Sequence, residues 1–464
     1  MANSTPHASL GRVKRLCWLC VATMTVGAAC RSRPPAAASF DEAAETFVRL
    51  GLALAERDPD SLDLYAGPPD WRAAAARDEA PLDAIRDRAR SLAERIETTD
   101  DHRRDRGDRR ENFFLRALRA LRFTSSPNRP ADGGRADHLL QQIRALGTRI
   151  DILKGARPRF DDESRLLFGT AVAPPDPARI TAVRDELDRR LPGRGSLRAR
   201  YAAYQRAFLV PESRRFAVVE RALAECRRRT RDHLALPADE QLTIAWVSST
   251  PWPAFTRHDG SFHSRLELNA ALALTVDGAL DIACHEGYPG HHAIAVLQDA
   301  ELVRRQRRIE FSLQLLFSPD ALRSEGLATV ASDVAFDEGE RATFERMELL
   351  PLAGLSPTDL DVDGHVRIEQ LVAEFRRVQV DIARRYVDGQ LEFVRAAAQL
   401  EVDALVAAPD AFLKFVNEFR TYPVAYVAGA DLVKQALGRA AGDERWNKYR
   451  EIALHARDVM PAPR

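Results

Sequence analysis

Cysteine is scarce in this sequence, and most of it lies near the N-terminus. The chain has 464 residues and five cysteines, of which Cys226 and Cys284 alone follow residue 30. Two cysteines cannot make the disulfide framework of a small secreted protein. We expect them to be buried free thiols, although an exported location would permit one disulfide.

The chain also lacks net charge and is poor in lysine. It carries 68 basic and 68 acidic residues, and its five lysines leave arginine as nearly the whole basic set. A balanced chain has no broad electrostatic attraction to nucleic acid. Arginine runs such as 227–229 have acidic residues nearby, which is typical of solvated helix faces. We therefore expect no nucleic-acid partner.

Long apolar runs are absent except near the N-terminus. The run Leu16–Ala29 follows the basic pair Lys14-Arg15 and is too short to span a bilayer. This pattern predicts a signal peptide over residues 1–29. Small residues before Cys30 resemble a bacterial lipobox, which would make Cys30 a lipid anchor to a membrane of the cell envelope. An ordinary cleaved signal peptide is the alternative.

Beyond a predicted flexible tether at residues 30–40, we expect one large, mainly α-helical domain at residues 41–460. Apolar residues recur there at helical spacing. A small β-sheet is predicted at about 242–269, where Thr243–Val247 and Phe262–Asn269 read as strands. Pro251-Trp252-Pro253 and Asp259-Gly260 read as turns.

Three of the eleven histidines fall in one short stretch, at His285, His291 and His292, and Glu286 follows the first. Zinc sites commonly use His-Glu-x-x-His on a helix, with the glutamate as general base. On an unbroken helix, His285 and His291 would lie ~9 Å apart along the axis and on different faces.

Pro289 and Gly290 interrupt this stretch, since proline disfavours a continuing helix and glycine accepts unusual backbone angles. We interpret the stretch as a zinc motif with a bulge before its second ligand. The alternative is a helix that ends at Gly287, followed by a turn and two surface histidines.

The segment Cys284–His292 resembles the signature of the DUF885 family of zinc metallopeptidases of the gluzincin type. Ser324–Ala328 resembles that family's Glu-Gly-x-Ala motif, and Arg420–Gly429 resembles its closing Arg/Tyr/Gly segment. The resemblance covers roughly residues 40 to 455. Many relatives have a glutamine where this chain has Ala293-Ile294-Ala295, which puts substrate contacts there in doubt.

The resemblance implies that His285, His291 and Glu325 ligate Zn²⁺, from helices at about 275–340. It selects His291 over His292, which geometry alone would not separate. His292 would instead contact substrate. Asp281 and Asp333 are candidates to orient the ligands, although aspartates at such positions are more commonly surface residues of a helix.

The resemblance further implies roles for three residues and for the sheet. Glu286 would be the general base, Tyr426 would stabilise the oxyanion, and Arg420 would bind a substrate carboxylate. A sheet edge beside a deep helical cleft would bind extended substrate, although a plain structural hairpin is equally open.

The sequence thus predicts a zinc-dependent hydrolase of peptide or related amide bonds, acting on a peptide or small amide substrate. Two alternatives stay open. One is a non-catalytic envelope lipoprotein that binds ligands in a helical cleft. The other is a metal-dependent hydrolase of non-peptide amides or esters. Oligomeric state, side-chain preference and exo- versus endo-cleavage do not follow from the sequence.

Overall fold

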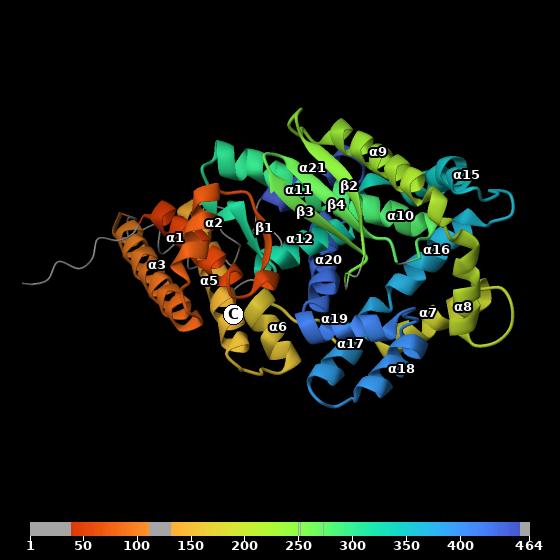
Figure 1. The fold of residues 1–464 in the computed structure, drawn as a ribbon, viewed down its shortest axis with the longest axis horizontal. Coiled ribbons are helices and arrows are strands. Elements are labelled where there is room, and N and C mark those ends of the chain that lie inside the picture. Colours follow the sequence, from red (N-terminus) through yellow and green to blue (C-terminus); the bar gives the residue numbers. More distant parts are fainter. Residues whose placement is uncertain (1–38, 111–130, 249, 251, 272, 455–464) are drawn as a thin grey trace, which may run out of the picture. The chain divides into compact units, whose positions relative to one another are not determined.

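Apolar residues at helical spacing form helices along most of the chain, as predicted (Figure 1). The structure is a computed structural model that describes residues 39–110, 131–248, 250, 252–271 and 273–454. These residues belong to one unit, Ala38–Arg464. The predicted signal peptide, Cys30 and most of the tether lie outside the described residues.

The helices of the described residues have the following bounds: α1 Phe40–Ala55, α2 Pro69–Asp78, α3 Leu82–Arg110, α5 Ala131–Leu153, α6 Phe160–Phe168, α7 Pro177–Arg190, α8 Leu197–Gln205, α9 Arg215–His233, α10 Val276–Ile282, α11 His291–Gln298, α12 Pro319–Thr329, α13 Ala331–Ala335, α14 Glu338–Phe344, α15 Leu350–Ala353, α16 Val362–Ala373, α17 Arg376–Val387, α18 Phe393–Asp403, α19 Pro409–Phe419, α20 Pro423–Leu437 and α21 Gly442–Leu454. Short π-helical turns lie at Ala283–Gly287, Asp299–Arg305 and Glu345–Leu349. No helix of the described residues is both long and apolar enough to cross a membrane.

The first helix begins within the predicted tether and shortens it. The Ser39 side chain accepts a hydrogen bond from the backbone N–H of Glu42, and the Glu42 carboxylate accepts one from the Ser39 backbone. This capping box satisfies backbone donors at the start of α1. Phe40 is buried in the first turn. The predicted tether at residues 30–40 is therefore wrong at its last two residues.

A three-stranded sheet occupies the predicted region, with strands β2 Gln241–Val247, β3 Ala254–Gly260 and β4 His263–Asn269. Their order is β2-β4-β3, with β2 parallel and β3 antiparallel to β4. Strand β3 was not predicted, because its flanking prolines and Asp259-Gly260 read as turns. The sheet therefore has one strand more than predicted, and β3 forms one of its edges.

A second pairing joins segments far apart in the sequence. Strand β1, Leu62–Tyr65, runs antiparallel to β5, Leu313–Leu315, immediately before α12. Ser318 then caps α12 by accepting a hydrogen bond from the backbone N–H of Ala321. The segment that follows α1 is thereby joined to the strand that precedes α12.

Helices α12 and α20 pack closely along each other (Figure 1). A methyl group added at Gly326 would come within 2.4 Å of the Gly429 backbone, and one at Gly429 within 2.3 Å of the Leu322 carbonyl oxygen. Only glycine on both helices permits this approach. The crossing brings the side chains of α20 over Glu325 on α12.

The two cysteines of the body are both buried free thiols, on α9 and on the π-turn after α10. The sulfur atoms of Cys226 and Cys284 lie 2.7 Å apart. Burial raises the pKa of the Cys284 thiol well above its usual range. Neither thiol has the character of an exposed nucleophile.

Candidate metal centre

The backbone between the two candidate histidines is bent rather than helical throughout. Helix α10 passes into a π-turn at Ala283–Gly287, the Tyr288-Pro289 peptide is cis, and α11 begins at His291. A Cβ at Gly290 would meet the His285 carbonyl oxygen at 1.8 Å, so only glycine fits there. This bend brings the His285 and His291 rings to 4.8 Å between centroids.

Glu325 of α12 completes a three-residue group with these histidines. Its carboxylate oxygens lie 3.5 Å from His285 Nε2 and 3.6 Å from His291 Nε2. One ligand atom from each residue can be chosen so that all lie within 4.8 Å of one another. Two imidazoles and one carboxylate form a donor set that suits zinc.

Two hydroxyl groups fix this triad. Ser324 Oγ lies 3.2 Å from His291 Nδ1, at hydrogen-bond distance, which leaves Nε2 facing Glu325. The Tyr422 hydroxyl donates a hydrogen bond of 2.7 Å to Glu325 Oε1. The sequence analysis missed Tyr422, although it lies in the quoted segment Arg420–Gly429.

Glu286 lies beside the triad and carries a free oxygen. Its backbone carbonyl accepts a hydrogen bond of 2.8 Å from Thr256 Oγ1 of β3, which ties the π-turn to the sheet edge. Among the described residues, Glu286 Oε2 and Glu325 Oε2 are buried without a hydrogen-bond partner. A buried carboxylate oxygen without a partner is costly unless a cation or water satisfies it.

The triad opens into a cavity of about 330 Å³. Its walls come from β1, β3, α11, α12, α19 and α20, among other segments. Tyr426 lines it, with its ring 6.3 Å from that of His285. Asp63 of β1 also lines it, and accepts a hydrogen bond from the Gln314 side chain. No motif near Asp63 in the sequence indicated that it would lie in the site.

The charges of the site are strongly interdependent. Burial lowers the pKa of His291, but Glu325, Glu286 and Asp63 together outweigh burial and raise it to about 9. The pKa of Glu325 falls below its usual range, because His291 and His285 offset burial. Burial, partly offset by His291 and reinforced by Glu325, raises the pKa of Asp63 to about 6. The carboxylates thus favour a positive charge between the two histidines.

Two predicted site residues, Arg420 and His292, make their contacts away from the triad. Arg420 does not line the cavity; its Nε donates a hydrogen bond of 2.7 Å to Glu163. His292 is fully buried, with Nδ1 2.7 Å from Ser264 Oγ and Nε2 2.9 Å from Glu240 Oε2. His292 therefore ties α11 to β4 through Ser264.

The proposed orienting carboxylates also point away from the triad. Asp281 pairs with Arg341 at 2.8 Å, and Asp333 lies 3.5 Å from Lys434. Ser324 and Tyr422 occupy the positions that these aspartates were expected to fill. Closeness in sequence did not identify the residues that orient the ligands, because the groups that contact the ligands come from α12 and from the residue that precedes α20.

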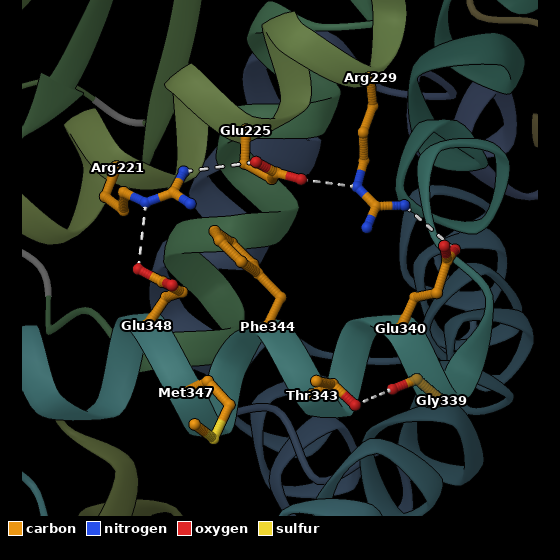
Figure 2. Close-up of a pocket in the computed structure, with 9 residues that line it drawn as sticks. All are labelled: Arg221, Glu225, Arg229, Gly339, Glu340, Thr343, Phe344, Met347 and Glu348. Atoms are coloured by element: carbon orange, nitrogen blue, oxygen red, sulfur yellow. Dashed lines mark hydrogen bonds and ion pairs between the residues drawn. The ribbon is translucent and has the colours of Figure 1, made fainter.

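A second hollow lies between α9 and α14 and offers no comparable chemistry (Figure 2). Arg221 bridges Glu225 and Glu348, and Arg229 bridges Glu225 and Glu340, at 3.0 to 3.5 Å. Each of these charged groups already has a partner of opposite charge. The hollow is therefore a surface network of ion pairs.

No family model matches the chain, and no curated protein matches it. Two solved structures are similar to the chain. One is described as "the putative lipoprotein from Colwellia psychrerythraea", at 14% identity and TM-score 0.44, over 91% of this chain and 76% of that one. The other is "a putative lipoprotein of unknown function from Shewanella oneidensis", at 12% identity and TM-score 0.43, over 90% and 81%. The resemblance to DUF885 rests on its motifs alone.

Proposed function

We propose that the protein is a zinc-dependent hydrolase of peptide or related amide bonds. The observation that carries the proposal is the convergence of His285, His291 and Glu325 beside Glu286, whose carboxylate has a free oxygen in the same cavity. His285, His291 and Glu325 would hold the zinc. Bound zinc would supply Lewis acidity and lower the pKa of water towards ~7.

Glu286 and Tyr426 would move and stabilise charge around the scissile bond. Glu286 would accept the proton of the attacking water and pass it to the leaving nitrogen. Burial raises the pKa of the Tyr426 hydroxyl well above its usual range, so this group stays protonated and can donate to the developing oxyanion. Arg420 has no part in this proposal.

Strand β3 would align an extended substrate. It forms an edge of its sheet, pairs with no further strand among the described residues, and lines the cavity from Ala254 to His258. An edge strand offers main-chain donors and acceptors that bind peptides with little demand on side chains. Trp252, Phe255 and Phe415 add aromatic walls to the cavity.

The test replaces Glu286 by glutamine. We expect Glu286→Gln to keep about one equivalent of zinc at this triad and to lower hydrolysis of a peptide library by about 100-fold or more, as loss of a general base does. Glu348→Gln, in the hollow of Figure 2, is the matched control and should hydrolyse normally. Full activity of Glu286→Gln would remove Glu286 from the mechanism.

Other outcomes of the same assay separate the alternatives. Hydrolysis of esters or non-peptide amides, with no cleavage of peptides, would indicate the broader metal-dependent hydrolase. A chain that stays metal-free after reconstitution with zinc would favour the non-catalytic binding lipoprotein.

We propose an envelope location with a lipid anchor at Cys30, supported by the lipobox-like residues before it. Cys30→Ser should move the protein from the membrane fraction to the soluble fraction. An unchanged membrane fraction would contradict the anchor.

A further inference from the structure

A second group of metal-binding side chains lies buried away from the cavity. It consists of Asp277 on α10 and of His365 and Glu369 on α16. His365 and Glu369 are four residues apart, so they share one helix face. One ligand atom from each of the three residues can be chosen so that all lie within 4.8 Å of one another. None of these residues lines the cavity of the triad.

Four polar atoms of this group lack hydrogen-bond partners. His365 is 1% exposed and Asp277 is 7% exposed. Among the described residues, both ring nitrogens of His365, Asp277 Oδ1 and Glu369 Oε1 are buried without a hydrogen bond. His365 Nε2 lies 3.0 Å from Asp277 Oδ1, but the two are not aligned as donor and acceptor. So many unpaired atoms facing one another are costly without a bound group.

The surrounding charges leave a negative excess. Arg341 is held by Asp281 at 2.8 Å and by Glu345 at 2.9 Å, so its charge is already shared between two carboxylates. His365 Nε2 lies 3.0 Å from Asp277 Oδ1, and His365 Nδ1 lies 4.0 Å from Glu369 Oε1. Burial and Asp277 raise the pKa of Glu369 to about 7, and burial raises that of Glu345 to about 7. A divalent cation would offset this excess better than one proton.

Neighbouring side chains hold the group in place. The Tyr201 hydroxyl of α8 donates a hydrogen bond of 2.8 Å to Glu369 Oε2, which leaves Oε1 free. The Phe208 ring stacks on His365 with 3.6 Å between centroids and an interplanar angle of 8°. Both contacts fix ligand orientation, as the partners of metal ligands usually do.

We infer that Asp277, His365 and Glu369 bind a second divalent transition-metal ion with a structural role. One imidazole nitrogen and two carboxylate oxygens suit zinc or manganese. The ion would join α10 to α16. Because α10 continues into the π-turn that carries His285 and Glu286, the ion would also support the helix that positions the triad.

The test incubates the purified mature chain with Zn²⁺ or Mn²⁺ and then dialyses it. Elemental mass spectrometry measures the number of metal ions that stay bound per chain. We expect two equivalents in the wild type and one in the double variant His285→Ala/His291→Ala, which removes the triad. Adding Glu369→Gln to the double variant should leave none. Glu374→Gln, at a half-buried glutamate that follows the last residue of α16, is the matched control and should keep the count of the double variant.

The double variant decides the inference even if Glu369→Gln does not fold. One retained equivalent, with a thermal midpoint that a chelator lowers, supports the second site. No retained metal and no effect of the chelator would overturn it. Loss of peptide hydrolysis leaves the count at the second site unchanged, so failure of the proposed function and failure of this inference give different results.

Discussion

At the scale of single residues, the triad depends on hydroxyl groups that no sequence motif identified as partners of the ligands. Tyr422 donates to Glu325, and Ser324 lies at hydrogen-bond distance from His291. Such partners fix the orientation of ligands and commonly change metal affinity by about 10–100-fold when removed. The triad is thus held from α12 and α20 as much as from its own motif.

Tyr422→Phe should weaken zinc binding by about 10-fold or more, because Glu325 loses its hydrogen-bond donor. Competition with a coloured chelator measures this affinity. Tyr386→Phe is the matched control, since that hydroxyl donates to the exposed Asn417 side chain far from the triad in sequence. Equal zinc affinity in wild type and Tyr422→Phe would contradict the role of this hydroxyl.

Glu240 links stability to pH through its contact with His292. Burial raises the pKa of Glu240, but its hydrogen bonds with His292, Tyr288 and Arg231 lower it to about 2. A carboxyl with a lowered folded pKa stabilises the fold above its unfolded pKa and loses that contribution as pH falls through the folded value. The contribution is up to about 3 kcal/mol at neutral pH.

Glu240→Gln should therefore lower the free energy of unfolding near pH 7, and the gap to wild type should narrow as pH falls from about 4.5 to about 2. Urea unfolding at several pH values measures both. A gap that stays constant with pH would show that the carboxylate charge is not what stabilises this contact.

At the scale of elements, close backbone approaches place the ligands. The interruption between the π-turn and α11, with the close backbone approach at Gly290, brings the two histidines together, and the Gly326–Gly429 crossing places α20 over Glu325. The sequence motif predicted a bulge between His285 and His291. It could not predict the glycine crossing, because that contact joins residues about a hundred positions apart.

Gly429→Ala should destabilise the protein by about 1–3 kcal/mol, because the new methyl group would overlap the Leu322 carbonyl oxygen. Denaturant unfolding measures the loss. Gly339→Ala on α14 is the matched control, since its nearest neighbour would be Asp337 Oδ1 at 3.5 Å, an ordinary contact. Equal loss in both variants would show that the helix crossing is not tight.

At the scale of the whole molecule, the cavity is assembled from segments spread from β1 to α20. The sequence predicted the helical class, the sheet region and the three residues that the structure brings together. It could not predict Asp63 or Tyr422, because they reach the site through strand pairing and helix packing. It assigned Arg420 and His292 to substrate, whereas each satisfies a buried carboxylate elsewhere.

The most direct test is anomalous diffraction at the zinc absorption edge from crystals of the mature protein grown with zinc. We predict a strong anomalous peak within coordination distance of His285 Nε2, His291 Nε2 and a Glu325 carboxylate oxygen. The absence of anomalous density between these three side chains, in zinc-saturated crystals, would contradict the metal centre and the hydrolase built on it.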